Sequence, residues 1–144
     1  MRKILVIVLL LWPDFAYAGA RDVARSYLEA RCKTLQRGAT AHDVERVVRL
    51  LSDDIVLQHP RFGAVVDGKE AVRRGLLSHL DDYLGNEKNS GIELLSLMEA
   101  PGVVIMKTRT TFLVRDKAGE RRISSEGVTV AEVAGDQIRR LIEY

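Results

Sequence analysis

The hydrophobic period changes once along this chain, from helical spacing to strict alternation, and this change limits the folds that the sequence can adopt. After the first 18 residues, apolar positions recur at helical spacing in 20–37, 40–51 and 67–84, with short extended pieces at 55–59 and 64–66. From Ile92 onward, apolar and polar residues alternate in four segments: Ile92–Ala100, Val103–Arg115, Arg121–Val133 and Gln137–Tyr144. Helices followed by an antiparallel meander are typical of an α+β fold with helices on one face of a curved sheet.

The N-terminal segment has the three parts of a secretory signal peptide. A basic start, Met1–Lys3, precedes an unbroken apolar run, Ile4–Trp12, and the small-x-small pattern of Ala16–Ala18 follows. Nine apolar residues are far fewer than the roughly 20 that a membrane-spanning helix needs. We therefore predict cleavage after Ala18, a periplasmic or secreted location, and a single domain over residues 19–144.

Composition excludes several classes of protein. With 47% hydrophobic and 29% charged residues, the 144-residue chain is neither disordered nor a polytopic membrane protein. Removal of the first 18 residues lowers the formal charge from +2 to +1, which gives no electrostatic reason to expect a nucleic-acid partner. Cys32 is the single cysteine, so the chain has no internal disulfide. His42, His59 and His79 lack the paired spacing of metal ligands. The sequence also has no glycine loop of the kind that binds phosphate, so it predicts no cofactor.

Alternation assigns side chains to the two faces of the expected strands. Ile55, Leu57 and His59 share one face of the first strand. In the long strand from Val103, one face is formed by Val104, Met106, Thr108, Thr110, Phe112 and Val114. Lys107 and Arg109 mark the other face as the more solvated one. Gly127 lies inside the next strand, where a glycine indicates a bulge or a bend.

Three segments resemble the nuclear transport factor 2-like superfamily, and its SnoaL-like branch in particular. Leu51–Pro60 and Val66–Arg73 are similar to the run of acidic pair, strand, proline, short strand, glycine and helix in that branch. Gly135–Tyr144 is similar to the last hairpin of the family. The resemblance implies a cone-shaped sheet wrapped around a helix, a cystatin-related roll, with a pocket at the wide end and a homodimeric assembly.

The resemblance also suggests positions for chemistry. His59 stands just before the proline, where steroid-isomerase-like members carry a general-base aspartate, and imidazole titrates close to working pH. Glu126 lies near the position of the acid that those members keep protonated, although a solvent-facing carboxylate is the alternative. Cys32 falls at the position of their helical tyrosine, and a thiol is a poor hydrogen-bond donor. Tyr27 lies more than one helical turn before Cys32.

Limonene-epoxide-hydrolase-like members need an Asp-Arg-Asp set, for which Arg109 is the best-placed arginine, but its charged neighbours favour an outward face. His42 and His79 are expected to be exposed. The residues expected to contact a ligand in the implied pocket are Tyr27, Cys32, Leu57, Phe62, Met106 and Phe112.

Two functions remain open on the sequence. The favoured one is an exported, non-catalytic domain that binds a small apolar or amphipathic ligand. The alternative is a cofactor-free isomerase, cyclase or dehydratase in which His59 abstracts a proton next to a carbonyl. Glu126 or another pocket donor would then stabilise the oxyanion.

Overall fold

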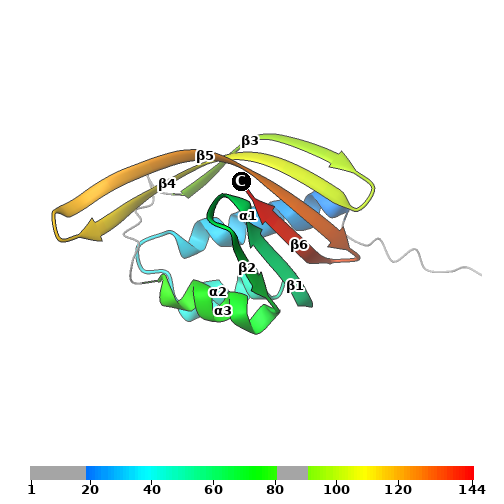
Figure 1. Ribbon diagram of the computed structural model, residues 1–144, viewed down its shortest axis with the longest axis horizontal. Coiled ribbons are helices and arrows are strands. Elements are labelled where there is room, and N and C mark those ends of the chain that lie inside the picture. Colours follow the sequence, from blue (N-terminus) through cyan, green and yellow to red (C-terminus); the bar gives the residue numbers. More distant parts are fainter. Residues whose placement is uncertain (1–18, 81–90) are drawn as a thin grey trace, which may run out of the picture.

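The computed structural model describes residues 19–80 and 91–144 (Figure 1). The predicted signal peptide, the end of the third predicted helix with Tyr83 and Leu84, and most of the polar loop 85–91 lie outside these residues. The elements in chain order are α1 (Ala20–Thr34), α2 (Ala41–Val48), β1 (Leu51–His59), a 3-10 turn (Pro60–Phe62), β2 (Ala64–Asp67), α3 (Lys69–Ser78), β3 (Gly91–Ala100), β4 (Val103–Asp116), β5 (Gly119–Ala134) and β6 (Gln137–Glu143). In the described ranges, no helix is long and apolar enough to cross a membrane.

The strands form one curved sheet in the order β2-β1-β6-β5-β4-β3, which confirms the predicted α+β fold. The four C-terminal strands are antiparallel neighbours, as alternation predicted. β1 joins them by pairing in parallel with β6, with Leu57 opposite Leu141. In Figure 1 the long strands β3, β4 and β5 arch over α1, and α2 and α3 lie on the other side of that helix. The N-terminal helices therefore fill the concave side of the sheet.

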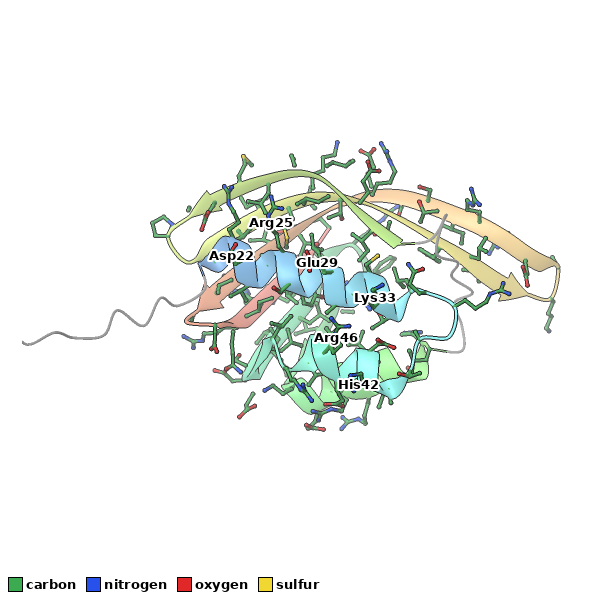
Figure 2. All side chains as sticks on the ribbon, turned by 180° about the vertical axis from the view of Figure 1, so that it is seen from behind. Asp22, Arg25, Glu29, Lys33, His42 and Arg46 are labelled. Atoms are coloured by element: carbon green, nitrogen blue, oxygen red, sulfur yellow. The ribbon has the colours of Figure 1, made fainter. Side chains whose placement is uncertain are left out.

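The first helix has one face for the core and one for solvent. Its buried stripe is formed by Val23, Ala24, Tyr27, Leu28 and Ala30. Figure 2 shows residues of alternating charge along its outer side, in the order Asp22, Arg25, Glu29 and Lys33. Oppositely charged side chains three or four residues apart support a solvent-exposed helix face.

The second helix begins at the predicted capping box and ends earlier than predicted. The Thr40 backbone N–H donates to the Asp43 carboxylate at 2.9 Å. The helix stops at Val48, because the residues after it pair with the sheet. The Ile138 N–H donates to the Leu50 carbonyl at 2.8 Å. Helical spacing assigns Leu51 to this helix, but the residue is instead the fully buried first residue of β1. The first helix also ends early, at Thr34 rather than residue 37.

The sheet core follows the predicted faces of β4. Val104 and Met106 are fully buried, whereas Lys107 and Arg109 are exposed. Of the predicted bulge or bend at Gly127, the bulge is wrong: this residue pairs with Thr108 in an unbroken β4–β5 ladder. The register shift lies farther along, where β5 pairs with β6 between Glu132 and Val133.

Candidate functional site

A cavity of about 540 Å³ lies between the inner side of α1, the helix α3 and the concave face of the sheet. Its apolar surface comes from both helices and the strands, and includes Leu28, Leu35, Leu57, Val72, Leu76, Ile92 and Phe112. At its rim stand Phe62 and Tyr144, which are 79% and 60% exposed. The size and the predominantly apolar wall fall in the range of small-molecule sites in proteins.

Hydroxyl groups cover part of the sheet wall. β4 supplies Thr108 and Thr110, and β5 supplies Ser125 and Thr129. Thr110 and Ser125 are paired across the two strands, so their side chains share a face. The cavity therefore combines hydroxyl groups on β4 and β5 with aliphatic side chains from the helices and the strands.

His59 meets a carboxylate at the end of β1. Its Nδ1 lies 3.4 Å from Oε2 of Glu143, and both side chains are about one-third exposed. Leu57 and Leu141 are opposite each other in the parallel β1–β6 pair, and His59 and Glu143 each come two residues later, on the same face. The strand pairing thus brings the imidazole and the carboxylate together in the cavity wall.

Tyr27 reaches the same carboxylate from α1. Its hydroxyl donates to the other oxygen of Glu143, Oε1, at 3.4 Å. Burial raises the pKa of the Tyr27 phenol, the Glu143 carboxylate raises it further, and the nearby Arg31 guanidinium opposes the shift. Tyr27 is therefore a protonated hydrogen-bond donor at all pH values near neutrality.

Glu143 is the member of this cluster that sequence reasoning missed. The alternation of β6 does place it on the same face as Leu141. What the sequence did not indicate was the parallel partner of β6, and without that partner Glu143 had no predicted relation to His59.

The predicted neutral carboxyl at Glu126 is corrected by the structure. Its carboxylate lies 2.9 Å from the Lys107 ammonium and 2.7 Å from the Arg109 guanidinium. Hydrogen bonds from both cations lower the pKa of Glu126. Because Glu126 pairs with Arg109, its side chain shares the exposed face of the sheet, although the residue also borders the cavity. Glu126 is a solvated, charged carboxylate, and Arg109 faces outward as expected.

Of the six expected ligand contacts, Tyr27, Leu57, Phe62 and Phe112 line the cavity. Cys32 and Met106 are absent from its lining. The Cys32 sulfur instead accepts a hydrogen bond from the Ile92 backbone N–H at 3.4 Å, between α1 and β3. Met106 is fully buried in the core.

Three further polar residues of the lining were not predicted to belong to it. Arg31 is half-buried on α1, whereas Arg61 and His79 are exposed near the mouth. His79 was expected to be exposed, and it is, but it borders the cavity as well. His42 lies on the exposed side of α2 (Figure 2). Among the described residues, histidine, cysteine, aspartate and glutamate form no group of three or more that could hold a metal ion.

Comparison with known proteins agrees with this architecture. The model of a family described as the SnoaL-like domain matches residues 33–141. No curated protein sequence matches the chain. A putative SnoaL-like polyketide cyclase from Shewanella putrefaciens has 11% identity and a TM-score of 0.72, over 88% of each chain.

Two other solved structures have the same fold. An epoxide hydrolase of Mycobacterium tuberculosis, described as LEH-like, has 16% identity and a TM-score of 0.65, over 87% of this chain and 80% of that one. A Catenulispora acidiphila protein with a ketosteroid isomerase-like fold, solved with trimethylamine, has 13% identity and a TM-score of 0.65, over 85% of this chain and 84% of that one. At these identities the likeness shows the fold alone.

Proposed function

Because this chain belongs to the SnoaL-like family, in which one fold serves several activities, we propose a function from its own cavity: it binds a small apolar or amphipathic molecule. The observation that supports this proposal is the cavity of about 540 Å³, which combines an aliphatic wall with a strip of hydroxyl groups. Such a wall favours ligands by burial of apolar surface, at about 25 cal/mol per Å², and the hydroxyl groups orient a polar end.

The proposal is tested by titrating decanol into the protein in a calorimeter. Leu76 lines the cavity, so Leu76→Trp fills it and is expected to abolish binding. Leu77, its neighbour on α3, is exposed and does not line the cavity, so Leu77→Trp is the matched control and is expected to bind like the wild type. Failure of the wild-type protein to bind decanol, or equal binding by Leu76→Trp, would overturn the proposal.

A second candidate function, proton transfer, is favoured by the contact between His59 and Glu143. A carboxylate beside Nδ1 favours the tautomer with the proton on that nitrogen, in which Nε2 can accept a proton from a substrate. Tyr27 lies next to the same carboxylate and keeps its own proton, so it can donate a hydrogen bond to an oxyanion. This set would suit an isomerase, cyclase or dehydratase without a cofactor.

Proton abstraction next to a carbonyl can be measured without the natural substrate. In D₂O, the wild-type protein is expected to catalyse hydrogen–deuterium exchange at the carbon next to the carbonyl of 2-decanone, followed by NMR. General-base catalysis contributes roughly 10²- to 10⁴-fold, so His59→Gln should reduce exchange by that order. His42→Gln, on the exposed side of α2, is the control. Exchange at the background rate in the wild-type protein would contradict the catalytic function and leave ligand binding intact.

We also propose that the domain acts outside the cytoplasm after cleavage at Ala18. The basic start, the apolar run and the small-x-small site support this proposal. The first described helix begins at Ala20, so the cleavage removes none of the described elements. Cell fractionation with intact-mass measurement is expected to find a chain that begins at Gly19 in the exported fraction. An uncleaved chain in the cytoplasm would be the opposing result.

The assembly proposed from the family resemblance is a homodimer. Light scattering during size-exclusion chromatography measures the mass of the assembly directly. A mass of two chains at micromolar concentration is expected, and a single-chain mass under the same conditions would contradict it.

A further inference from the structure

Arg31 differs from the other half-buried arginines of the described chain in what it contacts. Arg73 lies 2.7 Å from the Glu45 carboxylate, and Arg140 lies 3.7 Å from that of Glu132. Arg31 has no carboxylate within 4.0 Å among the residues that the structure describes. Its guanidinium donates instead to the neutral Thr34 hydroxyl at 2.8 Å and lies beside the Tyr27 phenol. Partly buried charges are usually paired, so a guanidinium whose partners among the described residues are all neutral is a position for an anion.

This guanidinium belongs to the cavity wall, and the charges around it favour an anion there. The cationic or protonatable groups of the lining are Arg31, His59, Arg61 and His79. The negative charge of the lining that remains is the carboxylate of Glu143. The Glu126 carboxylate does not count toward it, because Lys107 and Arg109 neutralise it on the outer face. Among the charged side chains of the lining, the two arginines therefore outnumber the one carboxylate that Lys107 and Arg109 do not neutralise.

We propose that Arg31 binds the carboxylate of an amphipathic ligand whose apolar body occupies the aliphatic part of the cavity. This inference rests on the proposed ligand-binding function and names the chemical class of the ligand. One planar guanidinium can bind a carboxylate through two parallel hydrogen bonds. Leu28 on the same helix and Leu35, just after its end, supply part of the apolar surface along which the body of the ligand lies.

The position of Arg31 also relates the ligand to the polar side chains of Tyr27, His59 and Glu143. Arg31 is one helical turn from Tyr27, and residues four apart lie on the same helix face. A carboxylate held by Arg31 therefore places the adjoining carbon atoms toward Tyr27 and Glu143. Arg31 is in this sense a specificity-determining residue rather than a catalytic one.

The test compares three probes of the same chain length: decanoate, decanol and decyltrimethylammonium. The wild-type protein is expected to bind decanoate more tightly than decanol, and the cationic probe most weakly. A charge-assisted hydrogen-bonded pair is worth roughly tenfold to a hundredfold in affinity. Arg31→Gln should lose that factor for decanoate and bind decanol as the wild type does. A purely structural role for Arg31 would instead weaken both probes together.

Two further variants keep the test decisive. Arg31→Lys retains the charge without the planar pair of donors, so it should keep a reduced preference for decanoate and remain folded by circular dichroism. Arg25→Gln removes an exposed arginine from the outer side of the same helix (Figure 2) and should leave all three affinities unchanged.

The outcomes separate this inference from the function on which it rests. If decanol and decanoate bind equally well, or if decyltrimethylammonium binds best, the carboxylate inference is overturned while ligand binding stands. If the wild-type protein does not bind decanol, the proposed function itself fails. A decanoate affinity that is unchanged in Arg31→Gln would also overturn the role assigned to this residue.

Discussion

The carbonyl oxygen of Tyr144 lies 2.9 Å from the point at which a side chain on Gly127 would begin. Real β-carbons essentially never approach a backbone oxygen so closely, and the two strands are held there by hydrogen bonds in both directions between Val128 and Tyr144. The glycine thus permits the last residue to close against β5 beside the cavity.

The first prediction concerns this close approach. Gly127→Ala is expected to destabilise the protein by about 1–3 kcal/mol, because the end of β6 must move away. Gly75→Ala is the control: it lies in α3 with open space around it, and it should be neutral or stabilising by about 0.5–1 kcal/mol. Urea unfolding measures both. A Gly127→Ala protein as stable as the wild type would mean that the strands are not closed in this way.

The two methionines of the described sheet give a second prediction. Met106 is fully buried in β4, whereas Met98 on β3 is 64% exposed. Met106→Ala should therefore cost about 2–5 kcal/mol in the free energy of unfolding. Met98→Ala should change it by less than about 0.5 kcal/mol. Similar losses for the two variants would contradict the assignment of Met106 to the core.

The capping box of α2 predicts a dependence on pH. Hydrogen bonds from Thr40, with that from its backbone N–H the strongest, hold the pKa of Asp43 below the ordinary value of 3.8. A carboxyl whose pKa is lowered on folding stabilises the protein above that ordinary value, and the contribution is lost as the pH falls through the folded value. Asp43→Ala should cost about 1 kcal/mol at pH 7, and the cost should shrink below pH 4.

Unfolding measured at several pH values between 7 and 3 checks this prediction. Glu29→Ala removes an exposed carboxylate from the outer side of α1 and serves as the control (Figure 2). It is expected to change stability little at any of these values. A cost for Asp43→Ala that stays constant down to pH 3 would show that the ionised carboxylate does not contribute to the cap.

The buried phenol predicts the opposite dependence at high pH. Burial and the Glu143 carboxylate raise the pKa of Tyr27 above its ordinary value of 10.0. In the unfolded chain this phenol loses its proton near pH 10, whereas the folded protein keeps it, so stability falls as the pH rises above 10. Tyr27→Phe removes this loss. The stability of the wild-type protein relative to the variant should therefore decrease between pH 8 and 11.

Denaturant unfolding across that range measures the difference. Tyr144→Phe, which changes a tyrosine that is 60% exposed, is the control and should follow the wild type. Parallel pH profiles for the wild type and Tyr27→Phe would contradict the burial of the phenol.

Local patterns predicted the elements that depend on local chemistry. The alternation of β4 assigned Met106 and Lys107 to the correct faces, and the helical spacing in 20–37 predicted α1. The boundary at Leu51 was wrong because an apolar residue at helical spacing can equally begin a buried strand. That choice is decided by the pairing of the chain with Ile138, a residue far away in the sequence.

The site was less predictable for the same reason. His59 could be placed by its own strand, but its partner Glu143 depends on which strand lies beside it. The family resemblance suggested Glu126 as a pocket acid without fixing the register of the β4–β5 hairpin, and pairing with Arg109 turns its side chain outward. The local sequence determines which face of a strand a side chain occupies. The residue that it contacts on a neighbouring strand depends on the register between distant segments.

The parallel pair of β1 and β6 also has a consequence for folding kinetics. The Gln58–Arg140 hydrogen bond in this pair joins residues 82 positions apart. Contacts of such high sequence separation cost loop-closure entropy before they contribute stability, so they slow folding. The local helices and the β3–β4–β5 hairpins can form early, but His59 and Glu143 meet only when β6 inserts beside β1. The polar end of the cavity is therefore expected to be completed in the rate-limiting step of folding.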